Sequence, residues 1–310
     1  GKDGLSSPSC VMGAKGTSIQ ILRHYLPAMS MFLRSVSYPM KLALSIMFGG
    51  RCEVCGEITA LEFVCSSGLL RLPYVDERMR PWNRILQRFE GAIPICRAYS
   101  LCYYIKGQGS QRIVTSIKYR HAQALGEWAG TFIADDALSS GIFDGVDLLQ
   151  PIPIHLLRLL KRSYNQSELI VRGIRKRTGI PIASLVRRRK YNVSQTKFHA
   201  MERRENVVGA FEGRRKAILK ALDEKDRKGK KQLHIAIVDD VITTGSTIIN
   251  CARAIMQAVP ERADEICFTV ISLAISGRSP IGAVTSEKLN LPDATISNEE
   301  FLALQHRPLS

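Results

Sequence analysis

The sequence predicts an α/β protein in which helices cover both faces of a parallel β-sheet. Two observations lead to this prediction. From about residue 111 onward, apolar runs typical of buried strands alternate with longer segments whose apolar residues recur at helical spacing. One of these runs, residues 233–241, passes through a short polar loop directly into the next helical segment, as a strand of a βαβ unit does.

The predicted elements follow one another in a regular order. Apolar residues at helical spacing predict a helix within residues 111–138, and a capping Asn165 or Ser167 followed by Gly179 predicts another. Residues 221–232 are so strongly charged that we expect a solvated hairpin or loop. The predicted strands are 146–154, 180–188, 209–212, 233–241 and 265–276, with a last helix at 245–259 between the final two.

Composition limits the classes of function. In 310 residues no apolar run approaches the roughly 18 that a membrane span requires, so we expect a cytoplasmic protein. The net charge of +16 favours an anionic partner, such as a polyphosphate substrate, nucleic acid or an acidic surface, but does not choose among them. Eight irregularly spaced cysteines do not suggest a disulfide scaffold, and they favour a reducing compartment.

The cysteines nevertheless suggest a metal site near the beginning of the chain. Cys52 and Cys55 have the CxxC spacing that supplies half of a tetrahedral zinc site, and Cys65 could be a third ligand. Cys96 or Cys102 could complete the set, although nothing in the sequence requires either. The segment CSSG at 65–68 resembles a second CxxC whose last thiol is missing. We therefore predict four parts: a partly disordered extension (1–45), a degenerate cysteine-bearing, zinc-finger-like module (46–105), the α/β domain (106–278) and a tail (279–310).

The segment IAIVDDVITTGST, residues 235–247, contains the most informative chemistry. In an open parallel sheet, ligands bind beyond the carboxyl ends of the strands, and Asp239 and Asp240 occupy such an end. The loop that follows leads into a helix, whose backbone N–H groups and dipole favour a phosphate. Capping the helix needs one hydroxyl, whereas this loop supplies four in five residues. The loop residues are Thr243, Thr244, Gly245, Ser246 and Thr247.

This segment resembles the 5-phosphoribosyl-1-pyrophosphate signature of the type I phosphoribosyltransferases. Three further segments resemble the ComF family of competence-associated phosphoribosyltransferase-like proteins, in the order expected for that family. They are IVTSIKYR (113–120), QPIPIHLLRLLKRSYNQSELI (150–170) and RRRKYNVSQTKFHAMERRENVVGAF (187–211). An N-terminal cysteine knuckle also belongs to the family, whereas Ser163 stands where the family has glycine. The resemblance implies a type I phosphoribosyltransferase-like fold over residues 46 to 276.

The resemblance also implies roles for individual residues. It places the 5′-phosphate on Thr243 to Thr247, the ribose hydroxyls on Asp239 and Asp240, and a further cation at Lys118. It places the pyrophosphate, accompanied by Mg²⁺, on a second loop. The residues of this pyrophosphate loop are Ile154, His155, Arg158, Arg162, Asn165 and Gln166. A flexible loop that closes over the substrate would carry Arg187, Arg189, Gln195, Arg203 and Asn206.

Three functions remain open at this level. The first is a phosphoribosyltransferase that binds phosphoribosyl pyrophosphate with Mg²⁺, acts on an unknown acceptor and is linked to DNA uptake. The second is a non-catalytic competence factor that handles single-stranded DNA together with other DNA-uptake proteins, which the positive charge favours. The third is a nucleobase salvage phosphoribosyltransferase, which the cysteine-bearing segment disfavours. The acceptor and the oligomeric state are not predicted.

Overall fold

The structure is a computed structural model that describes residues 50–59, 63–119, 123–154, 159–160, 163–188 and 210–277. The chain divides into two units, residues 1–52 with 56–62, and residues 53–55 with 63–310. In the described part of the smaller unit, Arg51 and Ile58 form an antiparallel bridge. All helices and strands given below belong to the larger unit.

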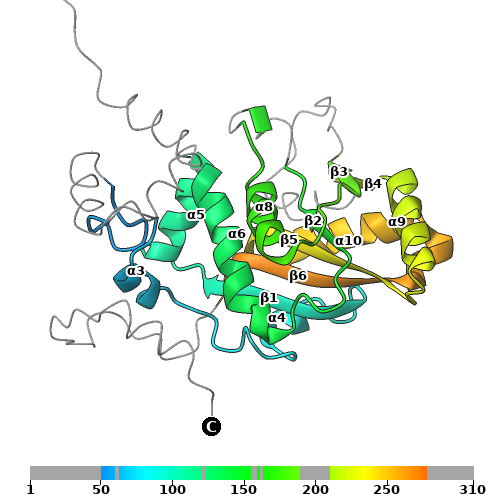
Figure 1. Ribbon diagram of the computed structural model, residues 1–310, viewed down its shortest axis with the longest axis horizontal. Coiled ribbons are helices and arrows are strands. Elements are labelled where there is room, and N and C mark those ends of the chain that lie inside the picture. The colour runs from blue at the N-terminus through cyan, green and yellow to red at the C-terminus, as the bar shows by residue number, and fades with distance from the viewer. Residues whose placement is uncertain are drawn as a thin grey trace, which may run out of the picture. The chain divides into compact units, whose positions relative to one another are not determined.

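A parallel sheet forms the centre of the larger unit (Figure 1). Its order is β1 (Ile95–Tyr103), β6 (Ile266–Ile275), β5 (Leu233–Ile242) and β2 (Leu148–Pro151), and every neighbouring pair is parallel. Every residue of β6 is buried, as expected for a strand that is covered on both faces. The predicted parallel α/β sheet is therefore confirmed.

Helices cover both faces of this sheet. One face is packed by α6 (Gln123–Ala137) and α8 (Gln166–Thr178), with α5 (Gly109–Tyr119) beside α6. On the other face, one hydrophobic cluster joins the sheet to α4 (Arg84–Gln87), α9 (Arg215–Arg227) and α10 (Ser246–Ala258). The remaining described elements are α3 (Ser66–Leu70), η1 (Leu138–Ser140), η2 (Pro260–Glu265) and an antiparallel pair, β3 (Val186–Arg188) and β4 (Phe211–Gly213).

Paired glycines allow α6 and α8 to approach closely. A Cβ atom on Gly173 would lie 2.1 Å from the carbonyl oxygen of Glu127, and one on Gly130 would lie 1.9 Å from that of Ile170. Backbone atoms inside two packed helices cannot move away cheaply. The two backbones therefore require glycine at both positions, and α8 is held against the sheet in a fixed position.

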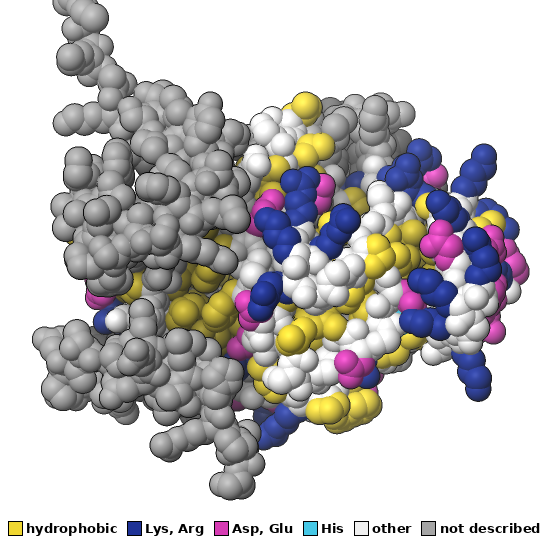
Figure 2. All heavy atoms as spheres, viewed as in Figure 1, with side chains coloured by type: hydrophobic (Ala, Val, Ile, Leu, Met, Phe, Trp, Pro, Cys, Tyr) yellow, Lys and Arg dark blue, Asp and Glu magenta, His cyan; other side chains and the backbone are white. Residues whose placement is uncertain are grey.

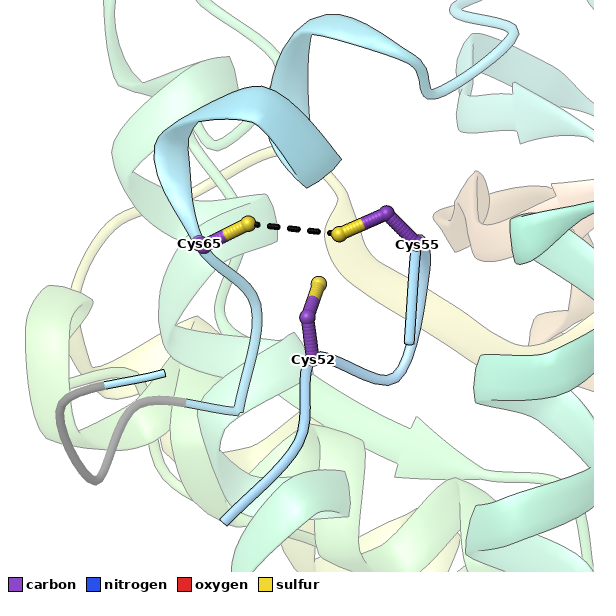
Figure 3. A group of neighbouring side chains, drawn as sticks. All are labelled: Cys52, Cys55 and Cys65. Carbon is purple, nitrogen blue, oxygen red and sulfur yellow. Dashed lines mark hydrogen bonds between the residues drawn. The ribbon is translucent and has the colours of Figure 1, made fainter. Parts of the chain in front are cut away.

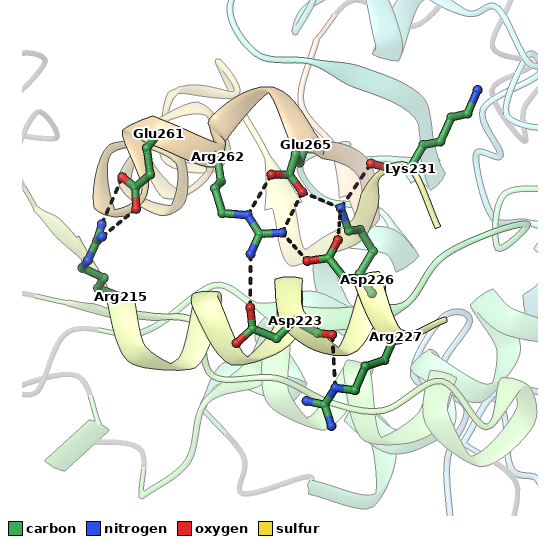
Figure 4. Close-up of polar contacts among 9 residues, drawn as sticks. Arg215, Asp223, Asp226, Arg227, Lys231, Glu261, Arg262 and Glu265 are labelled. Carbon is green, nitrogen blue, oxygen red and sulfur yellow. Dashed lines mark hydrogen bonds and ion pairs between the residues drawn. The ribbon is translucent and has the colours of Figure 1, made fainter. Parts of the chain in front are cut away.

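The charged segment expected to be a loop is largely helical. Residues 221–227 belong to α9, because Ile218 and Leu222 lie four residues apart on its buried side while its charged side chains, apart from the buried Lys225, are exposed. Arg262 of η2 pairs with Asp223 at 3.1 Å, with Asp226 at 2.6 Å and with Glu265 at 2.7 Å (Figure 4). These pairs connect α9 to the segment that leads into β6.

The sheet begins earlier in the chain than the predicted α/β domain does. β1 lies within the segment that we assigned to the cysteine-bearing module, yet it pairs with β6 from Ile95 and Phe268 to Tyr103 and Ile275. The single helix expected within 111–138 is described as two helices, α5 and α6. Within the described residues, none of the helices has the length and apolar character needed to cross a bilayer.

Candidate functional site

The turn between β5 and α10 provides the first part of the site. β5 ends at Ile242, and Gly245 precedes the first turn of α10 with a φ of +84°. A Cβ atom at Gly245 would lie 2.9 Å from the ring of Phe89, so both the backbone conformation and the space favour glycine. The hydroxyls of Thr244 and Ser246 lie 2.8 Å apart at this turn. The first N–H groups of α10 have no partners within the helix and can bind an anion.

Two adjacent carboxylates lie beside this turn. Asp239 Oδ1 accepts hydrogen bonds from the Ser167 hydroxyl at 3.1 Å and from the backbone N–H of Asp240 at 2.9 Å. The Lys118 ammonium group lies 2.7 Å from Asp240 Oδ2. The predicted cation therefore contacts one of the two predicted carboxylates, although more than a hundred residues separate them in the chain.

The two carboxylates differ in electrostatic environment. Burial and the nearby Asp240 raise the pKa of Asp239 from 3.8 to about 8. Asp240 has the Lys118 ammonium beside it, whereas no cation is paired with Asp239 among the described residues. A ligand that brings positive charge or hydroxyl donors to Asp239 would stabilise its ionised form, so this carboxylate is prepared to bind such a group.

The segment after β2 forms the opposite wall of the site. Asn165 precedes α8 and accepts a hydrogen bond from the Ser167 N–H through its side-chain oxygen, while its amide donates to the Ile152 carbonyl at 2.9 Å. The Nε2 of Gln166 is buried and has no hydrogen-bond partner within the described residues. A buried amide donor without a partner is costly, and it is expected where a ligand supplies the acceptor.

These walls enclose an open cleft with a volume of about 490 Å³. It lies where the carboxyl ends of β5 and β2 and the N-termini of α8 and α10 meet, which is where ligands bind in open parallel sheets. The predicted site residues that line the cleft are Lys118, Ile154, Asn165, Gln166, Asp239, Asp240, Thr243 and Thr247. The structure therefore brings together residues of the phosphate loop, the carboxylate pair and the pyrophosphate loop.

Other predicted residues lie elsewhere or cannot be placed. Arg187 is on β3, where it pairs with Glu212 of β4 at 2.7 Å and does not line the cleft. The predicted residues outside the described part of the chain are His155, Arg158, Arg162, Arg189, Gln195, Arg203 and Asn206.

Several residues that line or support the cleft were missed. Arg188, the neighbour of Arg187, lines it, as do Tyr104 after β1 and Ser276 after β6. Arg88 donates hydrogen bonds to the carbonyls of Thr243 at 2.6 Å and Ser276 at 3.0 Å, and thereby holds the phosphate loop against the end of β6. Ser276 could have been found, because it is the last residue of a predicted strand, whereas Tyr104 follows β1, which the sequence did not predict.

The cysteines predicted to bind zinc are shown in Figure 3. In the larger unit, the sulfurs of Cys55 and Cys65 lie 3.4 Å apart, and Cys65 also caps α3 by accepting from the Gly68 N–H. This separation fits two ligands of one ion, whose tetrahedral edge is on the order of 3.8 Å for Zn–S bonds. Cys52 belongs to the smaller unit. Zinc binding by these cysteines stays a prediction.

No family model matches the sequence. It is 32% identical over 108 residues to Competence protein F of Haemophilus influenzae, a match that covers 34% of this chain and 43% of the relative. The chain resembles the ComF family. This agrees with the resemblance found in the motifs, and the aligned part spans less than half of the relative's length.

Two solved structures are also similar in part. One is the glutamine phosphoribosylpyrophosphate amidotransferase from B. subtilis complexed with ADP and GMP, at 15% identity and a TM-score of 0.29. The other is described as the allosteric regulatory enzyme of purine biosynthesis, at 16% identity and the same TM-score. Each match covers 51% of this chain and 30% of the solved chain.

Proposed function

We propose that this ComF-like protein binds phosphoribosyl pyrophosphate with Mg²⁺ in the cleft and transfers the phosphoribosyl group to a nitrogen acceptor. One observation supports this most strongly. A carboxylate pair, a lysine and a glycine-containing helix N-terminus lie around one cleft of about 490 Å³. Each of the three matches a different part of the substrate.

The 5′-phosphate would bind at the N-terminus of α10. The loop before this helix offers the hydroxyls of Thr243 and Thr244, the first turn offers those of Ser246 and Thr247, and Gly245 allows the chain to turn tightly around the phosphate. Arg88 holds this loop through the Thr243 carbonyl. Since a phosphate monoester carries close to two negative charges, the helix dipole also contributes.

The ribose hydroxyls would donate hydrogen bonds to Asp239 and Asp240. Positive charge develops on the ribose when the bond from C1 to pyrophosphate breaks, and two nearby carboxylates stabilise that charge more than they stabilise the ground state. The raised pKa of Asp239 does not conflict with this role, because bound hydroxyls and a cation would lower it again.

The pyrophosphate would lie against residues 152–154 and the N-terminus of α8. Gln166 Nε2 is a buried donor that has no acceptor within the described residues, and Lys118 supplies a positive charge. Mg²⁺ prefers phosphate oxygens together with one or two carboxylates, a donor set that this cleft offers once substrate is present. When bound, the ion would neutralise charge on the leaving pyrophosphate.

Calorimetric titration with phosphoribosyl pyrophosphate and Mg²⁺ tests the binding proposal. We expect saturable binding by the parent and at least a tenfold weaker binding by the Asp239→Asn/Asp240→Asn variant. Arg187→Gln is a matched control outside the cleft, and it should bind like the parent. No binding by a folded parent would refute the proposed function.

Pyrophosphate release in the presence of candidate bases and amines then tests transfer. If the carboxylates act in the transition state, turnover in the double variant falls further than substrate affinity does. Binding without pyrophosphate release by any acceptor would favour a regulatory phosphoribosyl-binding protein instead. A nucleobase as the preferred acceptor would identify the salvage activity.

A link to DNA uptake is part of the proposal, because the relative is a competence protein and the net charge is +16. Lys and Arg side chains are prominent over α8 and α9 in Figure 2, with acidic side chains beside them. On α8, Arg172 pairs with Glu168 at 2.9 Å and Arg177 pairs with Asp135 at 2.5 Å. Paired cations bind DNA less readily, so catalysis or ligand binding in the cleft is favoured over DNA handling by this surface.

A further inference from the structure

Two cysteines and a histidine meet at the opposite edge of the sheet. Cys96, Cys267 and His234 are each the second residue of their strands, β1, β6 and β5. These strands are neighbours in the sheet, and His234 and Cys267 are register partners. One potential ligand atom from each residue lies within 4.8 Å of the other two. The carboxylates of the cleft are at the other end of β5, on the order of 17 Å away along the strand.

The three side chains suit a thiophilic metal ion. Two thiolates and a neutral imidazole are preferred ligands of Zn²⁺, and their two negative charges cancel the charge of the ion. Zn–S and Zn–N bond lengths give a tetrahedral edge of roughly 3.5–3.8 Å, so small side-chain rotations would close the present separations. His234 and Cys267 are buried, whereas Cys96 is exposed and leaves a path for the ion and for a fourth ligand from solvent.

The surroundings of His234 support a ligand role. The Nε2 atom lies 2.7 Å from the Thr269 hydroxyl. In the tautomer in which Nε2 donates its proton to this hydroxyl, Nδ1 has a lone pair for a metal ion. The backbone N–H of His234 donates to Asp147, and Lys230 pairs with the same carboxylate. These contacts hold the strand firmly where it carries the ring.

Two simpler explanations account for less of this arrangement. A histidine satisfied by Thr269 explains the position of His234 but not the two thiols beside it. A disulfide between Cys96 and Cys267 explains the thiols but gives no role to the histidine. The convergence of three donors from three neighbouring strands is explained by an ion that all three contact.

We propose that Cys96, His234 and Cys267 form a Zn²⁺ site with three protein ligands and an open fourth position facing solvent. The site is separate from the cysteines near residue 52 and from the cleft. Because it ties three neighbouring strands together at the amino ends of the sheet, occupancy would stabilise the fold without contacting the substrate.

Titration with Co²⁺ under reducing conditions tests this site, because tetrahedral thiolate-bound Co²⁺ absorbs visibly. The full chain is stripped of metal first, and Co²⁺ is then added to the parent, Cys96→Ser, His234→Gln and Cys102→Ser. The last is the control, since Cys102 lies on the same strand but outside the cluster. We expect the first two variants to lose one bound Co²⁺ per chain relative to the parent, and the control to lose none.

A second measurement uses only the parent protein and therefore tests the site even if the variants do not fold. In the reduced parent, alkylation of Cys96 is followed by mass spectrometry with and without Zn²⁺, and we expect Zn²⁺ to slow it at least tenfold. Equal Co²⁺ uptake by parent and Cys96→Ser would overturn the proposal. An alkylation rate of Cys96 that Zn²⁺ does not change would also overturn it. The same holds if the purified protein contains a Cys96–Cys267 disulfide and the two thiols take up no Co²⁺ after reduction.

Discussion

Replacing Asp239 with asparagine should make the protein more stable and at the same time weaken its binding of substrate. Asparagine has nearly the same shape, and its side-chain oxygen can still accept hydrogen bonds from the Ser167 hydroxyl and the Asp240 N–H. What it removes is a partly buried negative charge next to a second carboxylate. The effect on stability should therefore depend strongly on pH.

The magnitude follows from the raised pKa. The unfolded chain loses the Asp239 proton near pH 3.8, whereas the folded protein keeps it to about pH 8. Between these values the folded state binds one more proton, so the free energy of unfolding falls as pH rises. At about 1.4 kcal/mol per unit the full shift would cost about 6 kcal/mol above pH 8. Water in the open cleft screens the charge, and we expect a gain of about 2 kcal/mol for Asp239→Asn at pH 8.

Urea denaturation at pH 5 and pH 8 measures this difference. Asp239→Asn should exceed the parent by about 2 kcal/mol at pH 8 and by much less at pH 5. Asp240→Asn is the matched control, because it leaves Lys118 without its partner and should not stabilise. An Asp239→Asn variant that is less stable than the parent by the same amount at both pH values would refute the reasoning, since the carboxylate would then be structural.

Three further changes test other parts of the structure. Thr244→Ala should weaken phosphoribosyl pyrophosphate binding about tenfold or more, since a hydrogen bond to a charged phosphate is worth about 1.5–3 kcal/mol. The free energy of unfolding should change little. Equal affinity of variant and parent in calorimetry would contradict the phosphate assignment. Ser163 has a φ of +64°, a left-handed conformation that glycine adopts without strain. Ser163→Gly should therefore raise the free energy of unfolding, measured by urea denaturation, by about 1 kcal/mol. A lower free energy of unfolding in the variant would show that the serine side chain is needed. Gly173→Ala should lower the melting temperature by several degrees, because the alanine Cβ would meet the Glu127 carbonyl. This loss should outweigh the better helix propensity of alanine. An unchanged melting temperature would show that α6 and α8 can move apart to accept the methyl group.

The parts of the site that are contiguous in the chain could be predicted from the sequence. The strand end, the turn and the helix start between Asp239 and Thr247 are each determined by the residues that form them. The cleft lining includes both aspartates, Thr243 and Thr247. The parallel sheet was predictable for a similar reason, since the buried strands read as continuous apolar runs.

The parts that depend on tertiary contacts could not be predicted in the same way. Arg88, which directly follows α4, supports the phosphate loop from more than 150 residues away, and nothing near it in the sequence marks that contact. β1 was missed because its cysteines suggested a metal module and because its pairing with β6 is set by neighbours far along the chain. The α9 helix was missed because charge dominates its composition, although Ile218 and Leu222 have helical spacing.

The cleft is also where unfavourable features of the fold are concentrated. Asp239 has a raised pKa, and Gln166 has a buried donor without a partner among the described residues. Ser163, close before the start of α8, is a non-glycine residue in the left-handed region. The central strands of the sheet, by contrast, are apolar and buried along most of their length. A fold selected for stability alone would not gather such costs at one edge. A bound phosphate ester, diol and cation would offset the unfavourable electrostatics of Asp239 and Gln166. These unfavourable features therefore indicate a ligand site independently of any resemblance.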